Sequence, residues 1–217
     1  MNNASVNFDL GDLFRRSWEV YKKNVGPLLG AVVVVSVILG FGSLALNLIV
    51  RMGPLGGLII AGPLQLGLFK MVRQALRDEP VDFNLLFTGF SRFPDAYLAG
   101  LLIGIFSAIG AVFCIIPGII VQICYAGTYL FMNEKSLSFW DAMEASRKMA
   151  MNNPGQWVIL ALVLFAFNLA GLLACGLGWL ITAPMTYLII AMAYDLEQNA
   201  VIDVSVEPVS PATPPSA

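Results

Sequence analysis

Charged residues are spaced so widely along this sequence that they leave four long segments without any. Residues 24–50, 52–69, 96–133 and 149–194 contain no Asp, Glu, Lys or Arg. An ionised side chain at the centre of a bilayer costs about 2.5–3.5 kcal/mol, and about 20 helical residues cross the hydrocarbon once. The first two segments therefore fit one membrane span each, and the last two are long enough for two spans each.

The two longer segments each carry a helix breaker near the middle, "IIPG" at residues 115–118 and "CGLG" at residues 175–178. We therefore predict an all-α fold, a polytopic membrane helical bundle with six transmembrane helices. The composition agrees, because 58% of the residues are hydrophobic and only 12% are charged, whereas soluble domains have about 25% charged residues. The predicted spans are residues 26–50, 55–76, 95–114, 117–134, 155–174 and 178–196.

The basic residues predict the orientation of these spans. Of the 12 Lys and Arg residues, all except Arg51 precede the first span, lie in the last two turns of the second span, or lie at the junctions after the second and fourth spans. By the positive-inside rule, both termini are expected in the cytoplasm, and we place the chain in a bacterial cytoplasmic (inner) membrane. Residues 1–197 form the single membrane domain, and the Pro- and Ser-rich residues 198–217 are expected to be a disordered cytoplasmic tail.

Three short segments predict an internal repeat. "DLGDLFRRSW", "DFNLLFTGF" and "SFWDAMEAS" come into register when Asp9, Asp82 and Ser138 are aligned, and each begins with a residue suited to cap a helix. Each precedes a span, a turn and a second span with a proline near its start. We expect three units, each an interfacial amphipathic helix followed by a transmembrane hairpin, although unrelated amphipathic linkers would give a similar pattern. The units are residues 9–79, 82–134 and 138–197.

Three stretches resemble known proteins: "PGIIVQICYAGTYLFMNEKSLSFWDAMEASRKMAMNNPGQWV", "LFRRSWEVYKKNVGPLLGA" and "AGPLQLGLF". They are similar to a broad group of bacterial multi-pass membrane proteins of unknown function, and the membrane domain that precedes some glycerophosphodiester phosphodiesterases looks like a relative. The resemblance covers most of residues 8–197 and implies no catalytic residues. We do not expect the phosphodiesterase activity, because this chain has no room for the soluble catalytic domain.

The residue inventory argues against several kinds of chemistry. The chain has no histidine, which is the commonest general base and metal ligand, and a net charge of −2 without a basic cluster argues against a nucleic-acid partner. Cys114, Cys124 and Cys175 lie in apolar segments, too scattered for a metal or redox motif. We expect no enzyme activity, no cofactor, no bound metal and no disulfide between Cys114 and Cys175.

Small residues at a spacing of four predict where helices pack in a membrane. Gly100, Gly104 and Ala108 form one such series, and Ala166 and Ala170 belong to another. We favour packing within the monomer for both series, with dimerisation as the alternative.

Four polar residues are expected at depth in the membrane, namely Gln65, Gln122, Asn168 and Thr186. None is ionisable, which argues against an ion pump or a proton-coupled transporter. Three of them follow the proline of their unit and could face one another around a pseudo-threefold axis. We favour the interpretation that they satisfy backbone groups freed by those prolines; the alternative is a polar cavity of the kind found in transporters.

The predicted function is a non-enzymatic accessory or scaffold protein of the cell envelope. Its expected partners are membrane lipids and either another membrane protein or a second copy of the chain. The alternative is a carrier or channel for a small neutral or amphiphilic solute or lipid, moving along the pathway of Gln65, Gln122 and Asn168. A membrane-embedded enzyme is a third interpretation and would need chemistry from a cofactor or substrate.

Overall fold

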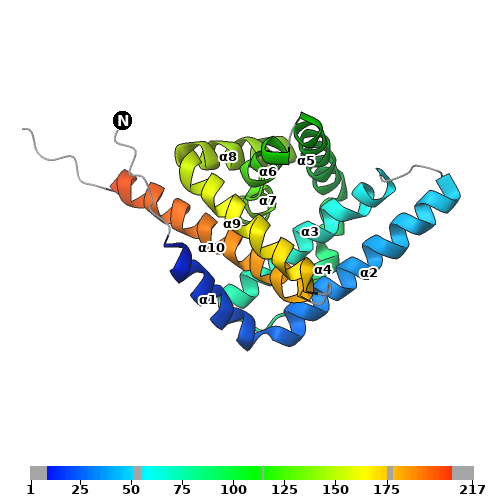
Figure 1. The fold of residues 1–217 in the computed structure, drawn as a ribbon, viewed down its shortest axis with the longest axis horizontal. Helices are drawn as coiled ribbons and strands as arrows, with labels where there is room; N and C mark the ends of the chain where they lie inside the picture. Colours follow the sequence, from blue (N-terminus) through cyan, green and yellow to red (C-terminus); the bar gives the residue numbers. More distant parts are fainter. Residues whose placement is uncertain (1–8, 51–54, 114, 175–177, 207–217) are drawn as a thin grey trace, which may run out of the picture.

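The computed structural model describes residues 9–50, 55–113, 115–174 and 178–206, and all regular secondary structure in these ranges is helical (Figure 1). The predicted all-α class is therefore confirmed. Arg51, Cys114, Cys175 and the end of the predicted tail lie outside the described residues. The helices are α1 (Leu10–Lys23), α2 (Val25–Val50), α3 (Leu55–Leu76), α4 (Asn84–Thr88), the 3₁₀ helix η1 (Gly89–Arg92), α5 (Phe93–Phe113), α6 (Ile115–Cys124), α7 (Thr128–Glu134), α8 (Phe139–Asn152), α9 (Pro154–Leu173) and α10 (Trp179–Val206).

Four stretches of helix in the described part of the chain are long and apolar enough to cross a membrane. They are Val25–Gly42, Asn84–Gly110, Pro154–Leu173 and Trp179–Asn199. The predicted spans at residues 55–76 and 117–134 are not among them. α3 has the predicted bounds, but its second half carries Lys70 and Arg73, and the span at 117–134 is divided into α6 and α7.

Two predicted boundaries need correction. The helix expected at residues 117–134 is interrupted at residues 125–127, and α10 continues to Val206, past the point where we placed the start of the tail. The first difference arises from a tertiary contact, because α8 packs against the interruption and its Ser146 satisfies the freed backbone. Ser146 Oγ donates to the carbonyl oxygen of Cys124 at 2.8 Å and accepts from the amide of Gly127 at 3.1 Å.

Replacing Ser146 by alanine should lower the free energy of unfolding by about 1–3 kcal/mol, because two buried backbone groups would lose their partner. Ser17→Ala is the matched control. Both serines are fully buried, but within the described part of the chain Ser17 Oγ makes a hydrogen bond only to the sulfur of Met192, at 3.3 Å. The stability of both variants is measured by unfolding the purified protein in mixed micelles with a denaturing detergent. An equal loss of stability in the two variants would contradict the role of Ser146 in satisfying the interrupted backbone.

The contacts between helices follow a recurring order. α1 packs on α10, α4 and η1 pack on α3, and α8 packs on α6 and α7. The hairpin pairs α2–α3, α5–α6 and α9–α10 are each in contact, and α3 also contacts α5, α6 contacts α9, and α10 contacts α2. Each short helix at the start of a predicted unit therefore lies against the second hairpin helix of another unit.

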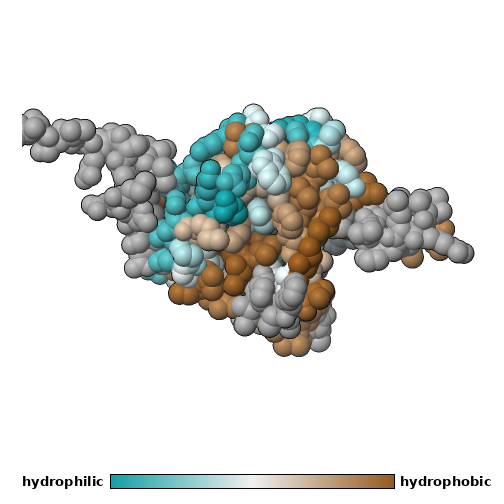
Figure 2. Space-filling view, turned by 90° about the horizontal axis from the view of Figure 1, so that it is seen from above, coloured by the Kyte–Doolittle hydropathy of each residue, from teal (hydrophilic) through white to brown (hydrophobic). Residues whose placement is uncertain are grey.

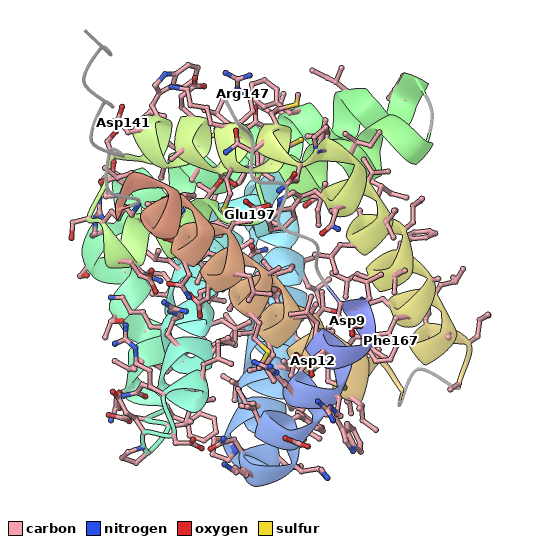
Figure 3. The ribbon with its side chains drawn as sticks, turned by 90° about the vertical axis from the view of Figure 1, so that its left-hand side faces the viewer. Asp9, Asp12, Asp141, Arg147, Phe167 and Glu197 are labelled. Atoms are coloured by element: carbon pink, nitrogen blue, oxygen red, sulfur yellow. The ribbon has the colours of Figure 1, made fainter. Side chains whose placement is uncertain are left out.

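The N-caps of two short helices are those that the sequence predicts. Asp9 accepts hydrogen bonds from the amides of Gly11 and Asp12, and Ser138 accepts one from the amide of Asp141. Ion pairs lie on the exposed faces of these helices. The hydrogen bond from Arg15 lowers the pKa of Asp12, and Glu144 pairs with Arg147 at 2.9 Å and with Lys148 at 3.4 Å. Figure 3 shows Asp141 and Arg147 on the outer edge of α8.

The surface separates into polar and apolar regions. In Figure 2 hydrophilic residues gather on the left and upper parts of the molecule, and hydrophobic residues cover much of the rest. Large apolar side chains are strongly exposed on three of the long helices, with Phe41 at 70%, Val112 at 85% and Leu173 at 76%. Such exposure suits a chain whose apolar surface faces lipid.

Only some of the small residues that were predicted to pack helices together lie in contacts between helices. Gly100 lies in a close contact, since a Cβ there would be 3.1 Å from the Cα of Gly62 and from the hydroxyl of Tyr129. Gly104 is half-buried, but Ala108, Ala166 and Ala170 are exposed, so the expectation that they pack within the monomer is wrong. Spacing places small residues on one side of a helix, but it does not say whether that side faces a neighbour. The closest helix contacts are made instead by Gly62, Gly67 and Gly89.

Candidate functional site

A cavity of about 540 Å³ lies among α3, α5, α6, α9 and α10, and all four predicted polar residues line it. Gln65 comes from α3, Gln122 from α6, Asn168 from α9 and Thr186 from α10. Helices from all three predicted units therefore contribute. The cavity falls within the range of about 300–1,000 Å³ that is usual for small-molecule sites.

Close packing beside the cavity fixes the two helices that carry Gln65 and Ser107. A Cβ on Gly62 of α3 would overlap the carbonyl oxygen of Ala96 on α5. Gly100, one turn further along α5, contacts Gly62 in turn. Glycine is needed on both helices here because their backbones approach directly. Ser107 lies further along α5 and lines the cavity, although no sequence pattern singled it out.

Asn168 and Thr186 are joined to each other across the α9–α10 hairpin. Asn168 Nδ2 donates to Thr186 Oγ1 at 2.7 Å and to the carbonyl oxygen of Leu164 at 2.8 Å. Thr186 Oγ1 donates to the carbonyl oxygen of Thr182 at 2.8 Å. Both side chains thus bond to their own helix backbone. Neither bonds to the carbonyl of Leu180, which is the group that Pro184 frees, so the favoured interpretation does not describe these contacts. Among the described residues nothing donates to Asn168 Oδ1, so this oxygen keeps its capacity to accept.

Gln65 and Gln122 behave differently. Within the parts of the chain that the structure describes, neither side-chain amide makes a hydrogen bond. The favoured interpretation, in which these amides satisfy backbone groups near the prolines, is therefore wrong for both. Ser107 Oγ is also buried without a hydrogen-bond partner. Of these three unpaired groups only the Ser107 hydroxyl is buried, while Gln65 is half-buried and Gln122 is exposed. An unpaired buried hydroxyl costs about 1–3 kcal/mol, so a ligand or water that pairs with Ser107 would remove this cost, and the two free amides are accessible to the same ligand.

The remaining lining is apolar or aromatic and uncharged. Phe69 stands between two tyrosines, edge-on to Tyr187 with ring centroids 5.3 Å apart and stacked with Tyr129 at 6.2 Å. No Asp, Glu, Lys or Arg is found among the described residues that line the cavity. An ionised ligand would therefore lose its hydration without gaining an opposite charge.

An ion-pair cluster closes the bundle beyond one end of the cavity. Arg73 of α3 donates through Nη1 to both carboxylate oxygens of Asp195 on α10, at 2.6 Å each, and pairs through Nη2 with Glu134 of α7. These residues lie four or five positions past the lining residues Phe69, Ile190 and Tyr129, which is about 6–8 Å along a helix.

Glu197 is a buried acid that no sequence pattern marks. Its side chain is 2% exposed and accepts hydrogen bonds from Asn153 Nδ2 at 3.0 Å and Trp157 Nε1 at 3.3 Å. Figure 3 shows it on the inner side of α10, well away from Asp9 and Asp12 on α1. Its neighbours come from the start of α9, so it ties the two helices of this hairpin together. Spacing along the sequence gave no indication that Glu197 meets Trp157.

The described residues contain no group of three or more His, Cys, Asp or Glu side chains that could hold a metal ion. No family model, no curated protein and no solved structure matches this chain.

Proposed function

We propose that this protein is a multi-pass protein of a bacterial inner membrane that binds a small, uncharged amphiphile in its intramembrane cavity and carries it within the membrane. The observation that supports this proposal is the convergence of Gln65, Gln122, Asn168 and Ser107 on one uncharged cavity. A mostly apolar lining with a few convergent hydrogen-bonding groups is typical of small-molecule sites. The apolar wall suits a hydrocarbon chain, and the open amides and hydroxyl suit a neutral polar group.

We also propose how the helices are arranged in the membrane. Six spans in three units, with both termini in the cytoplasm, would place α3, α6 with α7, and α10 around a common axis. The recurring helix contacts support this arrangement, as does the meeting of Arg73, Glu134 and Asp195 at one end of those same helices. The cavity would then lie at membrane depth, and the charged cluster would separate it from the cytoplasm.

A photoreactive medium-chain monoacylglycerol tests the proposal, because it joins an uncharged hydroxyl-bearing head to a hydrocarbon chain. Light-dependent labelling of the purified protein, followed by mass spectrometry, should map to peptides from α3, α5, α6, α9 and α10. An excess of unlabelled monoacylglycerol should suppress it. Gln65→Met removes one open amide with little change in shape, and it should weaken binding about tenfold. Labelling that resists competition, or that maps outside the cavity, would contradict the proposal and favour the accessory role.

Ser107→Ala should have opposite effects on the free and the bound protein. Removing an unpaired buried hydroxyl should raise the free energy of unfolding without ligand by about 1 kcal/mol, while binding of the monoacylglycerol weakens about fivefold. Ser36→Ala is the control, since Ser36 Oγ already donates to the carbonyl oxygen of Val32 at 2.6 Å and is outside the cavity lining. Detergent-induced unfolding measures the free energy of unfolding, and competitive labelling measures binding of the monoacylglycerol. Loss of stability together with unchanged binding would show that the hydroxyl serves the fold.

A further inference from the structure

The cavity has a mouth at the surface between two helices. Among the described residues that line it, Gln122 of α6 and Phe165 of α9 are exposed, and the others are buried or half-buried. Phe165 is 45% exposed. Because α6 and α9 contact each other, these two side chains mark an opening on the side of the bundle rather than at either end.

The surface around this mouth is apolar. Leu162, Leu169 and Leu172 share one face of α9 with Phe165, at helical spacing, and are 45%, 44% and 58% exposed. Phe165 also lies close to the middle of α9, about 2 Å from the midpoint of Pro154–Leu173 along the helix axis. In the proposed arrangement the mouth therefore faces the hydrocarbon near the centre of the bilayer, and water has no direct route to it.

Gln122 is an unexpected residue at such a mouth. Its amide is exposed and makes no hydrogen bond within the described part of the chain. An amide that faces hydrocarbon without a partner is costly, since lipid chains offer neither donors nor acceptors. A polar group that passes through or rests in the mouth would supply the missing partner. At the end of the cavity toward Arg73, the described residues Tyr129, Met132 and Tyr194 are all nearly fully buried.

We infer that the ligand is a single-chain lipid with an uncharged, hydroxyl- or ester-bearing head, and that it enters sideways from the bilayer between α6 and α9. Gln122 is the polar residue that meets the head at the mouth, and Phe165 narrows the opening. This inference rests on the proposed function and adds the source and class of the ligand. A phospholipid does not fit, because its phosphate would enter a cavity whose described lining carries no cation.

The test measures the rate of labelling in nanodiscs of phosphatidylcholine that contain the photoreactive medium-chain monoacylglycerol. Phe165→Trp enlarges the side chain at the mouth and should slow labelling several-fold. Leu162→Trp is the matched control, because Leu162 lies on the same exposed face one turn away and does not line the cavity. Both positions are exposed, so both variants are expected to fold.

A second probe, a photoreactive glycerol without a hydrocarbon chain, separates a membrane-borne ligand from a water-borne one. We expect it neither to label the cavity nor to compete. If it labels the cavity as well as the monoacylglycerol does, or if Phe165→Trp and Leu162→Trp change the rate equally, the lateral-entry inference is overturned and the proposed binding function stands. If neither probe labels the cavity, both the inference and the proposed function are wrong.

Discussion

Replacing Arg73 by leucine should lower the free energy of unfolding by about 2 kcal/mol, because the partly buried carboxylate of Glu134 and the more exposed one of Asp195, at 38%, would both lose their shared partner. The Arg73 side chain is only 16% exposed, and that of Glu134 is 23% exposed. Unfolding of the purified protein by a denaturing detergent, followed by circular dichroism, measures the loss. Arg77→Leu is the control, since Arg77 follows one turn later and is exposed, and it should change stability by less than about 0.5 kcal/mol.

A second substitution distinguishes a lost ion pair from lost packing. Adding Asp195→Asn to Arg73→Leu removes one of the two stranded charges, so the double variant should be more stable than Arg73→Leu alone. If Arg73 acts mainly through its contact with the ring of Tyr194, 5.9 Å from the guanidinium carbon, the second substitution should bring no recovery. Equal losses for Arg73→Leu and Arg77→Leu would contradict the cluster itself.

The sequence predicted most helix positions because charged residues and helix breakers mark where the long apolar helices begin and end. α2, α3 and α9 begin and end within one or two residues of the predicted spans. The interruption between α6 and α7 escaped notice, since it depends on Ser146, which comes from α8 and satisfies the exposed backbone. A local pattern does not contain information about a partner that arrives from elsewhere in the chain.

The candidate site was predictable in part for the same reason. The polar residues Gln65, Gln122 and Thr186 stood out because each follows a proline in an apolar segment, and the structure places them around one cavity with Asn168. The sequence did not show which of these side chains lack a hydrogen-bond partner, because the bond between Asn168 and Thr186 forms across a hairpin. Ser107 gave no signal, since one hydroxyl in an apolar helix is common and its importance here comes from lacking a partner.

Glycine positions show the limit of spacing rules most clearly. The regular series led to Ala108, Ala166 and Ala170, which are exposed. The close contacts use Gly67 and Gly89, which belong to no series. Gly67 lies in α3 and Gly89 begins η1, and the backbones of these two elements touch directly. Their proximity results from the packing of one unit on another, so spacing within a single helix does not reveal it.

Replacing Gly89 by alanine should therefore destabilise the protein by about 3 kcal/mol or more. A Cβ at this position would overlap the carbonyl oxygen of Pro63 and lie 3.0 Å from the amide nitrogen of Gly67. Both neighbours are backbone atoms that no rotamer change can move, so η1 must shift away from α3 as a whole. Gly67→Ala should be equally severe, because its Cβ would overlap the carbonyl oxygen of Leu86.

Gly26→Ala is the matched control for both substitutions. A Cβ on Gly26 meets nothing within 4 Å, and alanine is the better helix former by about 1 kcal/mol, so this variant should be neutral or slightly stabilised. Detergent-induced unfolding compares the three variants. Because Gln65 lies between Pro63 and Gly67 on α3, displacement of η1 should also reduce monoacylglycerol labelling in any Gly89→Ala protein that remains folded. A Gly89→Ala protein as stable as Gly26→Ala would show that α3 and η1 do not approach so closely, and the position of Gln65 in the cavity would have to be reconsidered.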